Sequence, residues 1–144
     1  MATNAIVYSV LRISLAALSA FSFGGLWYGP PGFIVAWKRE QERAGRVFPK
    51  KGAYVKHGTM TWVCAISAAY VTAIAISYVL AAAGITSVTD AALHGAAYGA
   101  AFVATSFGIN YAFSGYTLTL WLIDASYHIV QFAVTAAILA AMPL

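Results

Sequence analysis

Asp124 and His128 are the residues whose types and spacing suit proton transfer or metal binding. They lie in the segment LWLIDASYHIVQF, inside an apolar stretch that predicts a membrane span. On a helix, Asp124, His128, Gln131 and Thr135 share one face because they are spaced i, i+4, i+7 and i+11. A carboxylate that faces lipid costs about 3 kcal/mol, so we expect this face to turn towards other helices.

Three interpretations of this face remain open. Asp124 and His128, joined by His57, would be ligands for a metal, although two ligands on one helix are a weak signal. The same pair would also suit a proton or ion relay, as ionisable groups inside membranes often do. In the structural interpretation, Asp124 accepts hydrogen bonds that lock the helices together. Its donor would then come from another segment: Asn110, Tyr28 or Trp27.

The composition is that of an integral membrane protein. The chain has 144 residues, enough for one domain, and is 62% hydrophobic and 8% charged, where a soluble domain has roughly 25% charged residues. We therefore expect the chain to be embedded in a lipid bilayer. The net charge of +4 does not indicate nucleic-acid binding, because no soluble module is present to carry it.

The predicted fold is an all-α bundle of four membrane spans, at about residues 5–28, 58–83, 91–113 and 118–142. Asp90 is placed to cap the third span. Seven of the eight basic residues lie between the first two spans, and six of these fall in 38–51 of a basic loop at 38–56. The positive-inside rule then places this loop on the cytoplasmic or matrix side of a bacterial or organelle inner membrane. Both termini are expected on the opposite side.

The segment from Phe33 to Phe48 has its aromatic residues on one side and its charges largely elsewhere. This pattern predicts a short amphipathic helix on the membrane surface, and a solvated basic loop is the alternative. In either case we expect contacts with anionic lipid head groups or with a partner protein. The residues concerned are Lys38, Arg39, Arg43, Arg46, Lys50 and Lys51.

Two further features lie inside the spans. Arg12 is a third of the way along the first span, and it either extends to the nearer membrane surface or is a buried partner for a carboxylate or another subunit. Gly95 and Gly99 form a G-x-x-x-G in the third span, which permits close approach of helix backbones. The same motif suits packing between chains or inside one bundle.

Four short motifs resemble a known family. They are GGLWYGP at 24–30, FVAT at 102–105, NYAF at 110–113 and LIDASYH at 122–128. Together they resemble the small four-span membrane proteins catalogued as domain of unknown function 1761. The resemblance implies a four-helix membrane domain without an established activity. It also implies the signature positions Trp27, Tyr28, Asn110, Asp124, Tyr127 and His128.

Two functions of different classes follow. The first is a non-enzymatic accessory or structural subunit of a larger membrane complex, associated with other membrane proteins or with further copies of itself. The second is a small transporter or proton-linked channel that uses Asp124 and His128. The sequence shows no arrangement for nucleophilic catalysis and no phosphate-binding loop, so we expect no enzymatic activity, no metal and no cofactor.

Overall fold

The computed structural model describes residues 2–48 and 57–142, and within these ranges the regular structure is helical throughout. The helices are α1 (Ala2–Trp27), α2 (Ile34–Arg43), α3 (Thr59–Ala82), α4 (Val88–Tyr98), the π-helical stretch η1 (Gly99–Ala104), α5 (Thr105–Phe113) and α6 (Leu118–Ala141). The third apolar segment is therefore built from α4, η1 and α5 in succession.

Four helical segments are long and apolar enough to cross a membrane: Ile6–Trp27, Thr59–Ala82, Val88–Phe113 and Leu118–Ala141. The third begins three residues before the predicted residue 91. Its N-cap is Ser87, whose Oγ accepts a hydrogen bond from the backbone N–H of Asp90 at 3.3 Å. The prediction that Asp90 caps this helix is wrong, because a serine three residues earlier fills that position.

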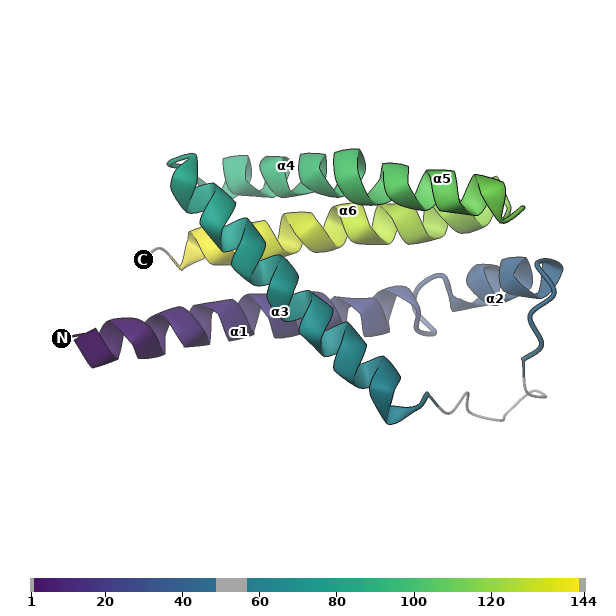
Figure 1. Ribbon diagram of the computed structural model, residues 1–144, viewed down its shortest axis with the longest axis horizontal. Coiled ribbons are helices and arrows are strands. Elements are labelled where there is room, and N and C mark those ends of the chain that lie inside the picture. The colour runs from purple at the N-terminus through teal and green to yellow at the C-terminus, as the bar shows by residue number, and fades with distance from the viewer. Residues whose placement is uncertain (1, 49–56, 143–144) are drawn as a thin grey trace.

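α6 is the central helix of the bundle, because it contacts every other helix. Figure 1 shows α1, α4–α5 and α6 running alongside one another, with α3 crossing them obliquely. The N- and C-terminal ends lie at one end of the molecule, and α2 and the turn between α5 and α6 lie at the other. A polar stripe on α6 is thereby surrounded by neighbouring segments.

Small side chains make up most of the core between α1, α3, α4 and α6. Fully buried positions include Ala16, Ala73, Ala91 and Ala136, none of which exposes any surface. Gly95 of the G-x-x-x-G faces the backbone of α6, where an added Cβ would collide with the carbonyl group of Phe132. The glycine motif therefore packs two helices of the same chain.

Arg12 is buried, with 5% of its surface exposed. The expectation that it extends to the membrane surface is wrong, because its Nη2 donates a 2.7 Å hydrogen bond to Oγ of Ser77 on α3. Tyr70 makes a second polar contact between the same helices by donating to Oγ of Ser14 at 3.1 Å. These hydrogen bonds fix α3 against α1 between Tyr70 and Ser77.

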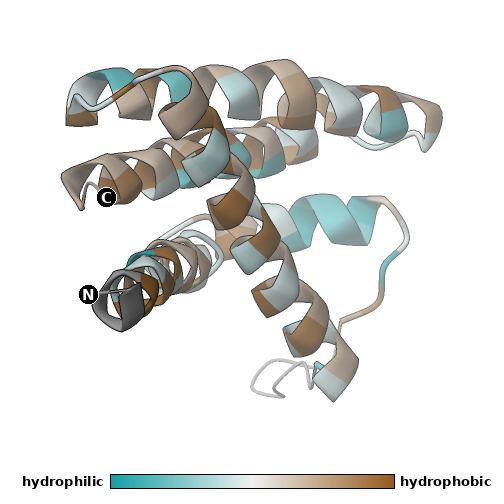
Figure 2. Ribbon diagram, turned by 60° about the vertical axis from the view of Figure 1, so that its left-hand side comes forward, coloured by the Kyte–Doolittle hydropathy of each residue, from teal (hydrophilic) through white to brown (hydrophobic). Residues whose placement is uncertain are grey.

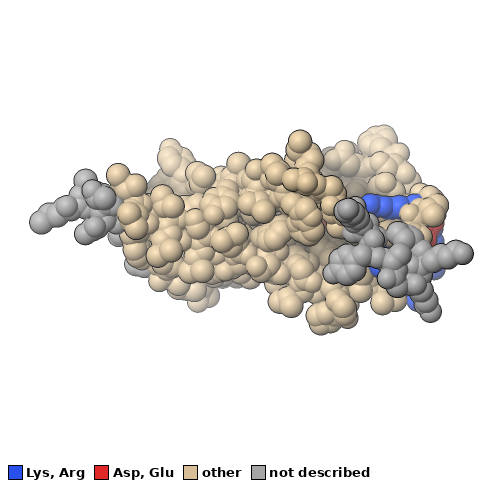
Figure 3. Space-filling view, turned by 90° about the horizontal axis from the view of Figure 1, so that it is seen from below, with Lys and Arg blue, Asp and Glu red and all other residues tan. Residues whose placement is uncertain are grey.

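The segment after the first span is helical from Ile34 to Arg43. Gly45, which has a positive φ of 86°, follows the end of this helix. It is shorter than the predicted range of Phe33 to Phe48. Figure 2 shows α2 as a hydrophilic helix beside predominantly apolar ones. Figure 3 shows that the Lys and Arg side chains visible on that face gather at the end of the molecule that contains α2.

Candidate functional site

Asp124 is the acceptor of three hydrogen bonds from three different segments. Its Oδ1 accepts from the Tyr28 hydroxyl at 2.7 Å and from Nε1 of Trp37 at 3.1 Å, and its Oδ2 accepts from the Tyr111 hydroxyl at 2.7 Å. The carboxylate is 95% buried, since 5% of the residue is exposed. One side chain of α6 thus joins the end of α1, α2 and α5.

The chain turn after α1 delivers two of these donors. α1 ends at Trp27, and the backbone N–H of Phe33 donates to the Trp27 carbonyl at 2.7 Å, which closes the Gly-Pro-Pro-Gly turn. After this turn, Tyr28 and Trp37 both donate to the same carboxylate oxygen of Asp124. Their rings are in edge contact at 5.9 Å. The helix-breaking prolines are therefore part of the construction of the site.

A second hydrogen bond fixes α5 beside the site. Nε1 of Trp121 donates to the backbone carbonyl of Ala104 at 2.9 Å, at the end of the π-helical stretch. Irregular turns of this kind release backbone carbonyls from the usual helical pattern, so a side chain from a neighbouring helix can bond to them. Gly108 leaves room for the Trp121 ring, because an added Cβ would lie 3.2 Å from its Nε1.

The electrostatics of the site depend on neutral donors. No ion pair within the described residues involves Asp124, and its three partners are two phenols and an indole. Burial raises the pKa of the Tyr28 phenol, and the hydrogen bond to Asp124 raises it further. Tyr28 therefore stays protonated and remains a donor, and both carboxylate oxygens are occupied.

Tyr127 is the centre of an aromatic layer next to Asp124. Its ring contacts the rings of Tyr28 at 5.1 Å, Phe23 at 6.1 Å and Trp27 at 6.3 Å. Gly24 makes this packing possible, since an added Cβ would lie 2.9 Å from the Tyr127 hydroxyl oxygen. Trp27 itself donates through Nε1 to the Ile123 carbonyl at 3.1 Å. The end of α1 is thus held on α6 by both packing and hydrogen bonding.

Four of the six predicted signature residues meet here, namely Trp27, Tyr28, Asp124 and Tyr127. His128 borders the layer, but its Nδ1 lies 3.1 Å from Oε1 of Gln131, and its ring packs against Phe107. Asn110 is exposed, and its side chain makes no hydrogen bond to the described residues. The proposed donor role of Asn110 is wrong, because its neighbour Tyr111 points to Asp124 instead.

The metal interpretation does not match the geometry. His57 is exposed and contacts the ring of Trp62 at 5.7 Å, away from Asp124. Among residues 2–48 and 57–142, no three His, Cys, Asp or Glu side chains come together as possible ligands. Asp124 and His128 are the members of the proposed set that lie on one helix, and their side chains have different partners.

Sequence reasoning missed Trp37 and Tyr111, and only one of them carried a usable signal. Phe107 and Tyr111 are spaced i, i+4 and their rings are 5.5 Å apart, so they share the face of α5 that meets α6. The i, i+4 spacing therefore places Tyr111 on this face and the adjacent Asn110 on a different one. Trp37 carries no such signal, because its position depends on the path of the turn between α1 and α2.

Glu40 provides a second link between α2 and the start of α6. The residue is 4% exposed, and its Oε2 accepts a 2.6 Å hydrogen bond from the hydroxyl of Thr117, the N-cap of α6. Its Oε1 pairs with Nη1 of Arg43 at 2.7 Å. α2 is therefore attached to the bundle through Trp37 and Glu40, on two successive positions of one helical face.

We expect Glu40→Ala to release α2 from the bundle. Loss of a hydrogen bond to a charged group costs about 1.5–3 kcal/mol, so amide exchange in Ile34–Arg43 should rise at least about tenfold. Glu42→Ala on the same helix is the matched control, because Glu42 is exposed. Hydrogen–deuterium exchange measured by mass spectrometry gives the exchange rate of α2 in each variant. Equal acceleration by the two variants would contradict an attachment through Glu40.

The basic residues of this segment differ in their surroundings. Arg46 lies over the rings of Trp37 and Phe48, at 5.7 and 5.4 Å, and Lys38 lies 5.9 Å from the centre of Phe48. Arg39 and Arg43 are exposed, and Arg43 is the ion-pair partner of Glu40. The predicted head-group contacts Lys50 and Lys51 lie outside the described residues.

An open pocket of about 340 Å³ adjoins the site at the turn between α5 and α6. Tyr111 and Thr117 line it, together with Gly108 and Trp121. Asp124 is not among the lining residues, because the hydroxyl of Tyr111 covers its Oδ2. Beside this pocket, the hydrogen bonds on Asp124 link the end of α1, α2 and α5 to α6.

One comparison with known proteins gives a match. The family model described as Protein of unknown function (DUF1761) matches residues 11–140. No curated protein and no solved structure matches the chain. The matched range contains Asp124 with all three of its donors, and the family description names no activity.

Proposed function

The chain belongs to the family described as Protein of unknown function (DUF1761), and we propose that it is a non-enzymatic accessory subunit of a larger membrane complex. The function combines two parts of the chain. The hydrogen bonds on Asp124 make a rigid frame of α1, α2, α5 and α6, and α3 offers a surface to a neighbouring membrane protein.

The exposed N-terminal half of α3 carries this proposal. The buried positions of α3 are Ala69, Ala73, Ile76 and Leu80, so burial begins only at Ala69. From Thr59 to Cys64 every residue is exposed, and Trp62 in this part makes an edge contact with Phe21 of α1 at 6.0 Å. An oblique helix that leaves its own bundle has a whole side available to another helix (Figure 1).

The residue types on this half suit a protein partner. Beyond Cys64, the exposed positions include Ser67 and Ala68, and Ala65 is half-buried. Small residues allow helix backbones to approach closely in lipid, where dispersion contacts and not the hydrophobic effect favour association. Contact with lipid alone does not require side chains this small, because lipid chains adapt to the shape of a helix surface.

Other features that suggested a protein partner make contacts within the chain. Arg12 bonds to Ser77, Trp121 bonds to the Ala104 carbonyl, and the glycines of the third span pack on α6. Tyr8 remains 38% exposed on α1. The proposal of a partner therefore depends on α3.

The geometry of Asp124 favours a structural subunit over a proton-linked transporter. A carboxylate that accepts three hydrogen bonds from neutral donors is stabilised in one position, whereas a relay group must exchange partners. For the orientation we propose that α2 lies at the cytoplasmic or matrix surface, with its basic residues on anionic lipid head groups and both termini on the opposite side.

Cys64 permits a direct test, because it is the single cysteine of the chain and is exposed on the open half of α3. A photoactivatable maleimide on Cys64, irradiated in the native membrane, is expected to give one adduct of defined mass. Ala68→Leu, one helical turn away, should abolish that adduct by separating the backbones. An adduct of two copies of this chain would identify self-association, and a different mass would identify another subunit.

The matched control moves the probe to a different exposed surface. In a Cys64→Ser chain that carries Leu93→Cys, the probe lies on α4, where Leu93 is 63% exposed. This control should give no defined adduct. Equal labelling of neighbours from both positions, or the absence of any protein adduct from Cys64, would contradict the accessory-subunit proposal.

A further inference from the structure

Arg12 is a buried cation with no ion-pair partner among the described residues. The chain has four acidic residues, Glu40, Glu42, Asp90 and Asp124, and the structure describes all of them. None forms an ion pair with Arg12, and the ion pair found among the described residues joins Arg43 and Glu40. Since arginine keeps its proton, a full positive charge remains in an apolar part of the bundle.

One donor of this cation also lacks an acceptor. Nη2 of Arg12 donates to Ser77 at 2.7 Å, but the Nε–H is buried and has no hydrogen-bond acceptor in the described part of the chain. Buried donors without acceptors are rare and costly. The guanidinium group is held in place by one bond and offers its remaining donors to a ligand.

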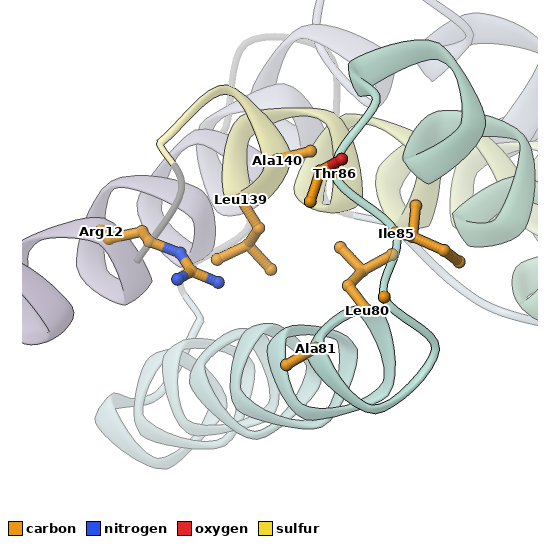
Figure 4. A pocket seen from close by; sticks show the side chains of 8 residues that line it. Arg12, Leu80, Ala81, Ile85, Thr86, Leu139 and Ala140 are labelled. Carbon is orange, nitrogen blue, oxygen red and sulfur yellow. The ribbon is translucent and has the colours of Figure 1, made fainter.

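Arg12 lines a pocket of about 220 Å³ where the end of α3, its turn into α4 and the end of α6 meet. Figure 4 shows the guanidinium group pointing into this pocket towards Leu139. Leu80, Ile85 and Leu139 give it an apolar wall, and Thr86 adds a hydroxyl group at the turn. The site therefore combines one positive charge with a surface suited to an alkyl chain.

We propose that this pocket binds the oxyanion head of a membrane amphiphile, either a fatty-acid carboxylate or a phospholipid phosphodiester. The planar donor edge of arginine matches two oxygens of either group, and a single negative charge balances Arg12. The alkyl chain would leave along Leu80 and Ile85 towards the lipid. The site is separate from the exposed half of α3, so it stands independently of the accessory-subunit proposal.

Binding to the full chain in phosphatidylcholine nanodiscs tests this assignment. The probes are oleate with oleyl alcohol as its neutral counterpart, and phosphatidylglycerol counted by native mass spectrometry. We expect at least one anionic probe to bind about tenfold more tightly than the neutral lipid, because hydrogen bonds to a charged partner are of that strength. Oleate alone would assign a fatty acid, and phosphatidylglycerol alone would assign a phospholipid.

Three variants make the test specific. Arg12→Gln should reduce the preference for the anion, whereas His94→Gln should leave it unchanged because His94 is exposed on α4 and does not line the pocket. Ala81→Phe should reduce binding by filling the pocket while Arg12 is intact, which covers the case in which Arg12→Gln does not fold. Equal affinity for oleate and oleyl alcohol with no preference for phosphatidylglycerol, or an unchanged preference in Arg12→Gln or Ala81→Phe, would overturn the proposal.

Discussion

Replacing Asp124 by leucine should lower the free energy of unfolding by about 2–4 kcal/mol, among the largest effects of any single substitution in this chain. The substitution removes three hydrogen bonds at once and leaves the donors of Tyr28, Trp37 and Tyr111 without an acceptor in a buried site. Reversible unfolding in mixed detergent micelles, followed by circular dichroism, measures the change. Ser126→Leu at a partly exposed position of the same helix is the comparison.

Asp124→Asn separates the structural role from ion transport. The amide oxygen still accepts from Tyr28 and Trp37, and the amide N–H can donate to the Tyr111 hydroxyl, so the cost should fall to about 1 kcal/mol. A relay would behave differently, because asparagine does not titrate. Proton flux in proteoliposomes that depends on Asp124 and stops in a stably folded Asp124→Asn protein would contradict the structural role and favour transport.

The position of the polar face on α6 could be predicted from the sequence because it depends on helical geometry alone. Once residues 118–142 are read as a span, the spacing of Asp124, Gln131 and Thr135 places them together, and all three are buried. The order of spans and turns along the chain likewise depends on short stretches of sequence. Its prediction needs no knowledge of how one helix crosses another.

The partners of that face could not be predicted in full, because they depend on the crossing of helices and the path of turns. The direction of α2 after the Gly-Pro-Pro-Gly turn decides that Trp37 reaches Asp124, and the phase of α5 decides that Tyr111 and not Asn110 does. The burial of Arg12 depends on the position of Ser77, far away in sequence. The oblique course of α3 likewise has no signature in its uniformly apolar sequence.

The glycine motif illustrates how the structure decides between two interpretations of one pattern. Gly95 lies against α6, where an added Cβ would collide with the Phe132 carbonyl and lie 2.8 Å from the Cβ of Ala136. The obstructing carbonyl belongs to the backbone of the central helix, which cannot move away as a flexible side chain would. The spacing of α4 and α6 is therefore set by the absence of a side chain at this position.

Gly95→Ala should accordingly destabilise the chain by about 2 kcal/mol through overpacking, measured by the same unfolding transition. Gly25→Ala is the matched control, since Gly25 also lies inside a helix but has nothing within 4 Å of an added Cβ, and it should be neutral or slightly stabilising. Adding Ala136→Gly should restore only part of the loss, because it removes the methyl group but leaves the Phe132 carbonyl. If Gly95→Ala instead leaves monomer stability unchanged and disrupts association between chains, the motif acts between copies and the packing described for α4 and α6 is not its role.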